Sequence, residues 1–157
     1  MSKREQILSD SDTRAVLATG EIGVLATVDA SGQPYGVPLN YYYDETENAL
    51  FAHCLIRGKK LDNLRENPRV SFTVIGEYVL EPERFTSRFR SAIVTGLATI
   101  IEEPDEKVLR LTHLNQRLAP QEAARYTEVI QRSLKSAAII RIEIVAATGK
   151  VNPAPKV

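Results

Sequence analysis

The strongest constraint on the fold is a pair of strand-like segments joined by a tight turn near the N-terminus. Residues 22–28 are almost continuously apolar, and residues 29–32 have hairpin-turn composition, with Gly32 free to take a positive φ. Residues 34–43 then alternate, which places five side chains on one face: Tyr35, Val37, Leu39, Tyr41 and Tyr43. Pro38 interrupts this run and cannot donate to a ladder, so we expect it at a sheet edge or a bulge.

Four further strand patterns and several helical segments follow. The strands are expected at residues 49–55, 70–75, 92–101 and 138–147. The helices are expected at residues 11–19, from 59 to about 67, from 104 onward and at 121–136. Ser11 or Asp12 is the expected cap of the first helix. Together these patterns predict a mainly β protein, a six-stranded antiparallel barrel with helical decorations. No linker or repeat divides residues 1–157, so we expect one domain, with 152–157 as a loose tail.

Composition excludes several classes of function. Lys and Arg total 20, as do Asp and Glu, and this neutral balance argues against a general nucleic-acid binder. No apolar run approaches the ~20 residues of a membrane helix, and the charged N-terminus lacks a signal core, so we expect a cytoplasmic protein without a membrane partner. Two distant histidines, His53 and His113, and a single cysteine, Cys54, give no metal-site spacing.

The segment 51–68 carries the clearest chemical signal. It reads as a strand running into a short helix, and Arg57, Gly58, Lys59 and Lys60 form the turn between them. Cations at a helix start are unfavourable because the peptide dipoles already leave partial positive charge there, unless an anion is bound. Free N–H groups, glycine and lysine together favour a phosphate. Alternatively, Gly58 is only an N-cap residue and the lysines are solvated charges facing Asp62 or Glu66.

Five segments, in this order along the chain, resemble the pyridoxamine 5′-phosphate oxidase-like split-barrel family: residues 22–28, 32–41, 51–53, 58–64 and 67–72. Residues 89–96 and 148–150 are similar to the branch of that family that contains the nitroimidazole-resistance (Nim) proteins. The resemblance implies an FMN-binding split barrel. It also implies a homodimer that binds two FMN molecules in clefts between the subunits.

The resemblance also implies particular site residues. Lys60 matches the phosphate-binding lysine of the family, with Lys59 or Arg57 adding charge. The flavin ring would lie along the second and third strands, where the candidate contacts are Val37, Pro38, Leu39, Asn40, Ala52, His53 and Cys54. From the partner subunit, Arg90 and Ser91 are candidates for the phosphate or the ring; alternatively, they are ordinary polar residues at a strand entry.

His53 is the candidate catalytic residue. On alternation it shares a face with Phe51 and Leu55, and Cys54 points the other way as a small core residue. An imidazole with a pKa near neutrality can give a proton to a small organic substrate that is being reduced. The alternative is that His53 is a structural residue of an apolar strand.

The function implied is an FMN-dependent oxidoreductase acting on a small organic compound. The arginine-rich substrate-phosphate motifs of a true pyridoxamine-phosphate oxidase are not found, so we do not expect that activity. A second functional class is also consistent with the sequence, namely a non-catalytic protein that binds or carries flavin or haem. Haem would need an axial ligand, for which His53 and His113 are the two imidazoles of the chain.

Overall fold

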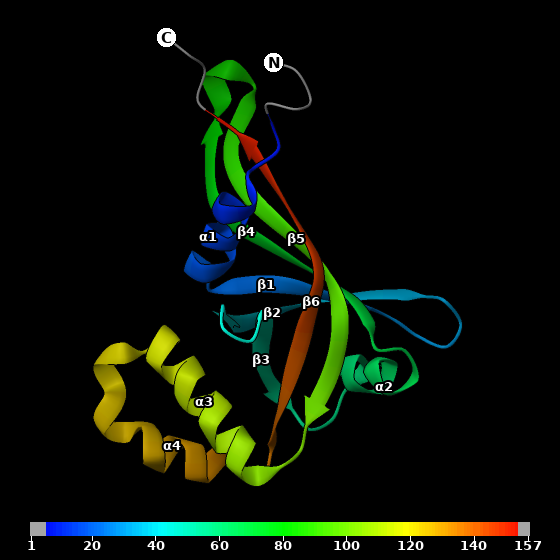
Figure 1. Ribbon diagram of the computed structural model, residues 1–157, viewed down its shortest axis with the longest axis vertical. Coiled ribbons are helices and arrows are strands. Elements are labelled where there is room, and N and C mark those ends of the chain that lie inside the picture. The colour runs from blue at the N-terminus through cyan, green and yellow to red at the C-terminus, as the bar shows by residue number, and fades with distance from the viewer. Residues whose placement is uncertain (1–5, 154–157) are drawn as a thin grey trace.

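The computed structural model describes residues 6–153, whose centre is a closed antiparallel barrel (Figure 1). The strands follow each other around the barrel in the order β1-β2-β3-β6-β5-β4. Their bounds are β1 (Ile22–Val28), β2 (Pro34–Asp44), β3 (Ala49–Leu55), β4 (Arg69–Glu81), β5 (Thr86–Ile101) and β6 (Ala137–Asn152). The expected six-stranded, mainly β architecture is confirmed.

The helices decorate the barrel at its ends and along one side. They are α1 (Asp10–Thr19), α2 (Lys59–Glu66), α3 (Pro104–Leu118) and α4 (Tyr126–Ser133). The cap of α1 is Ser9, whose hydroxyl accepts from the Asp12 N–H, so the expectation of a cap at Ser11 or Asp12 is wrong. The helix expected over 121–136 is divided into a 3₁₀ segment, Pro120–Arg125, and α4. Within residues 6–153, no helix is long and apolar enough to cross a bilayer.

Strands β4 and β5 are much longer than the sequence patterns indicated. They continue past the barrel as an arm closed by a 3₁₀ turn, Pro82–Arg84, with the end of β6 beside β5, and this arm forms the upper part of Figure 1. A bulge between Ile75 and Glu77 breaks the alternation, which is why the pattern stopped at Ile75. Strand β6 also extends further, and Asn152, expected in a loose tail, pairs with Phe89. Residues 154–157 lie outside the described part of the chain.

Two apolar clusters share the sheet. The first fills the barrel, where Leu25, Phe72 and Ile140 are fully buried, and the Tyr41 hydroxyl donates to the Leu17 carbonyl of α1 at 2.7 Å. The second lies outside the barrel, where α3 and α4 pack on β3 and β6 around Phe51. One face of β3 therefore contacts the barrel core and the other contacts the helices, which matches the predicted alternation of this strand.

A buried hydrogen bond holds α2 to the barrel. The Asn63 Nδ2 of α2 donates to the Thr27 Oγ1 of β1 at 2.9 Å, and both side chains are buried. This bond fixes α2 beside the end of the β1–β2 hairpin. The first turn of α2 is thereby positioned next to the end of β3.

We predict that Thr27→Val lowers the free energy of unfolding by about 1–3 kcal/mol, because the buried Asn63 amide loses its acceptor while the side-chain volume is kept. Urea denaturation followed by circular dichroism measures this loss. Thr27→Ser retains the hydroxyl and is the matched control. If Thr27→Val were as stable as Thr27→Ser, the bond would not be what holds α2.

Candidate functional site

The barrel is split between β2 and β3. These strands pair only over four residues each, from Tyr41↔Ala52 to Asp44↔Ala49. The remaining part of β2, residues 34–40, pairs only with β1, and residues 53–55 of β3 pair only with β6. Two facing strand edges are therefore left open, and unpaired backbone groups along an edge are available to a bound molecule.

Hydrogen-bond alternation identifies the groups at the open edges. The Tyr41 N–H donates to the Glu21 carbonyl on the β1 side, so the alternating residues Gly36, Pro38 and Asn40 face the split. The expectation that Pro38 lies at an edge is confirmed, and its missing N–H costs the sheet nothing there. On β3, the Ile56 N–H donates to Ser136 beyond the end of β6, so the backbone of His53 faces the split.

The start of α2 lies at the end of β3, beyond the split. Gly58, with φ 137°, is the N-cap residue and offers no side chain to the helix, so the N–H groups of Lys59 and Lys60 have no capping partner. The Lys60 ammonium folds back over this turn, since a Cβ placed on Gly58 would lie 3.8 Å from Lys60 Nζ. Free N–H groups, the helix dipole and a cation thus converge at one point, which is the arrangement that binds anions.

The three cations of this turn are not equivalent. Lys59 Nζ lies 3.4 Å from an Asp29 carboxylate oxygen and 5.5 Å from the centre of the Tyr35 ring. Asp29 in turn accepts hydrogen bonds from the Ser31 hydroxyl and the Gln33 N–H, and these lower its pKa to about 2. Within residues 6–153, neither Arg57 nor Lys60 forms an ion pair. Lys60 is half-buried and is therefore the cation best placed to hold an anion.

His53 projects from the outer face of the barrel, as the alternation of β3 predicted. Its side chain is exposed, although its partial burial lowers its pKa below the ordinary histidine value. The imidazole is therefore mainly neutral at neutral pH. Because the His53 backbone also faces the split, the ring stands beside the open edge rather than in the barrel core.

Other predicted contacts lie deeper. Val37, Leu39 and Cys54 are half-buried against the barrel core, and Ala52 is fully buried, so their side chains point inward. Burial raises the pKa of the Cys54 thiol, and the nearby Lys60 charge partly offsets this. Asn40 is exposed, but its Nδ2 donates to the Glu21 carbonyl at 3.1 Å, which leaves its Oδ1 as the side-chain group available to a ligand. The roles of these five residues stay predictions.

Arg90 and Ser91 lie at the base of the arm, far from α2 within the same chain. They are separated along β5 from Ala98, which bonds to Pro68 just after α2, by roughly 25 Å of extended strand. Successive residues of a strand face opposite ways, and Arg90 turns toward α1, where its Nη2 lies 3.4 Å from Asp12. Ser91 faces outward with Ile93. A contact of these residues with the α2 turn would therefore require another subunit, and their role stays a prediction.

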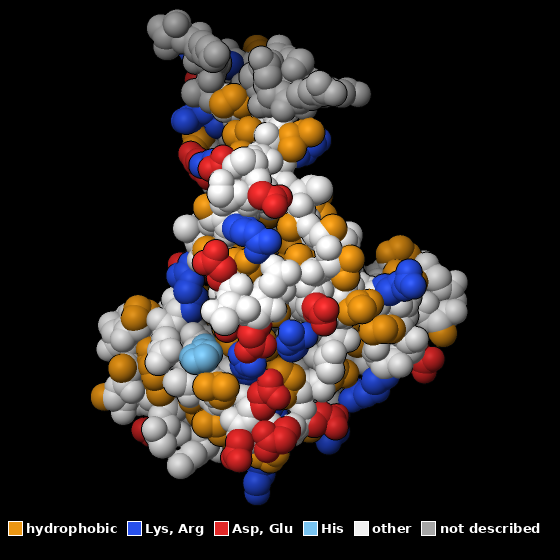
Figure 2. All heavy atoms as spheres, viewed as in Figure 1, with side chains coloured by type: hydrophobic (Ala, Val, Ile, Leu, Met, Phe, Trp, Pro, Cys, Tyr) orange, Lys and Arg blue, Asp and Glu red, His pale blue; other side chains and the backbone are white. Residues whose placement is uncertain are grey.

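The outer surface of β1, β4 and β5 was not anticipated from the sequence. It exposes a row of apolar side chains, the outer strip, that continues along one face of the arm: Val24, Ile75, Tyr78, Leu80, Ile93 and Leu97. A groove of about 600 Å³ crosses it beside Ala26, Ser71 and Thr95. Elsewhere, acidic and basic side chains are interspersed on the face that Figure 2 shows. Apart from Arg69, which also lines the groove, this face carries no charge, and a largely uncharged face of this extent is typical of a protein–protein contact.

The family model described as pyridoxamine 5′-phosphate oxidase matches residues 9–151. The chain belongs to the pyridoxamine 5′-phosphate oxidase family. The comparison with curated proteins gives no match. The expected family is thus confirmed by a match that includes the split, the α2 turn and most of the arm.

Three solved structures illustrate the range within this fold. A candidate 5-nitroimidazole antibiotic resistance protein from Bacteroides thetaiotaomicron has 20% identity and a TM-score of 0.72, covering 92% of this chain and 86% of its own. An FAD-binding protein from Mesorhizobium loti has 26% identity and a TM-score of 0.71, covering 94% and 98%. The haem storage protein HutZ from Vibrio cholerae has 16% identity and a TM-score of 0.68, covering 90% and 94%. The family fold alone therefore does not select one ligand.

We predict that the Asp29 carboxyl titrates with a pKa of about 2. Ser31→Ala should move this pKa toward the ordinary value of 3.8, because the hydrogen bond from the Ser31 hydroxyl contributes most to lowering it. A lowered folded-state pKa means that this group's contribution to stability is complete above pH 3.8 and is lost as the pH falls toward 2. Carboxyl-detected NMR titration measures both values. A midpoint near 3.8 in the unaltered protein would contradict the network that holds Lys59.

Proposed function

We propose that this protein is a cytoplasmic, FMN-binding oxidoreductase of the Nim-like branch, which works as a homodimer and reduces or oxidises a small organic compound. The observation that carries the proposal is the position of an uncompensated cation and uncapped N–H groups at the start of α2, directly beyond an open split in the barrel. FMN has a phosphate group and a flat ring with a polar rim. The α2 turn is the feature suited to the phosphate, and the open split is the feature suited to the ring.

The residues at the α2 turn suit a phosphate. Gly58 lets the chain approach the anion closely, the N–H groups of Lys59 and Lys60 are donors without partners in the helix, and Lys60 supplies charge. Arg57, exposed and without an ion pair in the described residues, is a second cation at the rim. Lys59 contributes less, because Asp29 already balances its charge.

The open edges suit the polar rim of the ring. Backbone groups of Gly36, Asn40 and His53 face the split and can exchange hydrogen bonds with the ring's nitrogen and oxygen atoms, while Pro38 offers its carbonyl only. Within one chain this edge is open to solvent on its outer side. A second subunit would cover the ring, which agrees with the family expectation of a site between two copies.

The outer strip supports a homodimer. It carries no acidic or basic residue over β1, β4 and β5 between Ser71 and Tyr78, and the chain as a whole has zero formal net charge, so two copies do not repel each other. A largely uncharged sheet face that is the same on both copies is suited to a two-fold contact. Ser91, which lies on this face, is then the partner residue best placed to approach the site.

When bound, FMN would supply the electron-transfer chemistry. The chain's own residues bind and orient it through the α2 turn and the split, and His53 holds a proton beside the open edge. Because the pKa of His53 is lowered, the protonated ring is a stronger acid than an ordinary histidine and gives its proton more readily, although it is populated mainly below neutral pH.

We predict that Lys60→Ala weakens FMN binding by about 1.5–3 kcal/mol, the range for losing a hydrogen bond to a charged group. Fluorescence titration of FMN measures the affinity. Lys59→Ala is the matched control on the adjacent residue and should have a smaller effect, since Lys59 is paired with Asp29. Equal losses in both variants would indicate a diffuse electrostatic effect, and no loss in Lys60→Ala would remove the phosphate assignment.

We predict that His53→Ala retains FMN but slows reoxidation of the reduced flavin by its substrate. The rate in the unaltered protein should rise as the pH falls below neutrality, because more of the imidazole becomes protonated, and the variant should lose this dependence. Stopped-flow absorbance with a nitroaromatic substrate measures the rate. His113→Ala, at a histidine of α3 that lies near Tyr42, is the control. An unchanged pH profile in His53→Ala would assign His53 a structural role.

A further inference from the structure

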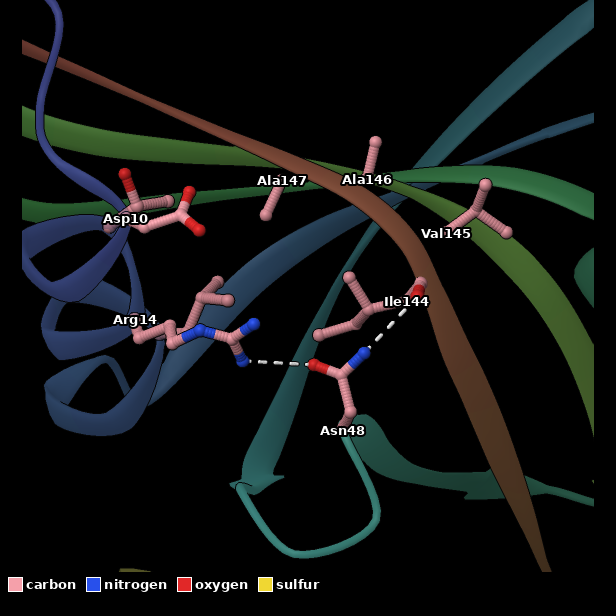
Figure 3. A pocket seen from close by; sticks show the side chains of 9 residues that line it. Asp10, Arg14, Asn48, Ile144, Val145, Ala146 and Ala147 are labelled. Atoms are coloured by element: carbon pink, nitrogen blue, oxygen red, sulfur yellow. Dashed lines mark hydrogen bonds between the residues drawn. The ribbon is translucent and has the colours of Figure 1, made fainter.

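A second cavity lies beside the turn that connects β2 to β3. The split lies at the other end of these two strands. The cavity has a volume of about 280 Å³ and is enclosed by α1, by Asn48 in the turn after β2, and by residues 144–147 of β6. Figure 3 shows Asp10 and Arg14 projecting from α1 into the same space, with Ile144 and Ala147 opposite them. None of these residues takes part in the site described above.

The guanidinium of Arg14 is fixed but not neutralised. Its Nη1 donates to the Tyr43 hydroxyl at 2.6 Å and to the Asn48 Oδ1 at 3.0 Å, and both acceptors are uncharged. Three of its five N–H donors, on Nε and Nη2, have no acceptor in residues 6–153. Arg110 is the contrast, because it contacts the carboxylates of Asp44, Glu47 and Glu106. Arg14 is therefore an oriented, exposed cation that no carboxylate pairs with in residues 6–153.

Asp10 supplies a negative charge one helical turn away. Residues four apart on a helix are neighbours, and an Asp–Arg pair at this spacing ordinarily forms an ion pair. Here Tyr43 and Asn48 hold Arg14 away, and no cation contacts Asp10 among the described residues. The cavity consequently has separate positive and negative walls, each available to a ligand.

The β6 side of the cavity is an open strand edge. Ile144 exchanges hydrogen bonds with Asn48, and the Leu8 N–H donates to the Gly149 carbonyl. Between them, residues 146–148 pair only with β5, and Val145 lies in a bulge without a ladder partner. The wall is preformed, because α1 packs so closely on β6 that a Cβ at Gly149 would lie 2.3 Å from Thr13 Oγ1. Leu17, Ile144 and Ala147 complete an apolar wall.

We propose that this cavity binds a small zwitterion, an L-α-amino acid. The carboxylate would bind the free donors of Arg14, the ammonium would face Asp10, and the side chain would lie against Leu17 and Ile144. A volume of about 280 Å³ is close to the lower end of the range for ligand sites and so limits the ligand to a small molecule.

The test is a binding comparison in which one charge of the ligand is removed at a time. A panel of L-amino acids is screened against the full chain by thermal shift, and the best binder is measured by calorimetry beside its N-acetyl and its α-amide derivatives. Both derivatives should bind at least about tenfold more weakly, since each loses a charged hydrogen bond. If no amino acid binds, or if a derivative binds equally well, the proposal is overturned.

Two variants connect the affinity to this cavity. Arg14→Gln should weaken amino-acid binding by about tenfold or more, and Asp10→Asn should remove the preference over the N-acetyl derivative. Asp10 forms no hydrogen bond or ion pair with another described side chain, so Asp10→Asn is not expected to disturb the fold. It therefore keeps the test decisive if Arg14→Gln fails to fold. Arg65→Gln, which alters a surface pair with Asp62 on α2, is the control and should leave binding unchanged. Unchanged binding in Asp10→Asn and Arg14→Gln would contradict the site. No part of this test depends on flavin.

Discussion

The separation of β2 from β3 is the constraint on which the rest of the structure depends. These strands stay paired next to their connecting turn and then diverge, so that each contributes an open edge while its other edge remains in the barrel. Pro38 fits this arrangement because its missing donor falls on the open side. The same divergence leads β3 away from β2 and into α2, so the α2 turn begins just beyond the open edge of β3. A continuous β2–β3 ladder would leave neither feature.

Charge compensation distinguishes structural from available cations in this molecule. Arg110 is buried among carboxylates and stacks 4.0 Å from the centre of the Phe51 ring, where it holds α3 against the barrel. Lys59 is balanced by Asp29. Lys60 and Arg14 differ, because no carboxylate pairs with either of them among the described residues. Arg14 is held instead by the uncharged Tyr43 and Asn48 side chains. Both of the sites proposed above rest on this difference, which sequence spacing does not reveal.

Local patterns predicted much of the fold. The hairpin of residues 22–43 was predicted closely because strict alternation and a glycine turn act over short distances, and the same applies to α2 and the barrel portion of β5. The sequence patterns did not predict the arm, because the bulge at Gly76 changes which face each residue occupies. The arm also has no core of its own, so its apolar residues need not alternate regularly with polar ones. The pairing of Lys59 with Asp29 and the buried Asn63–Thr27 bond join residues more than 25 positions apart, so only the folded chain shows them.

The central claim is that the α2 turn recognises the phosphate of a flavin that lies along the split. The most direct test compares the affinity of the purified protein for FMN with its affinity for riboflavin, which has the same ring without the phosphate. This account predicts that FMN binds at least about tenfold more tightly, since a charged hydrogen bond is worth about 1.5–3 kcal/mol. Equal affinity for the two compounds would contradict the claim, as would failure of both to bind.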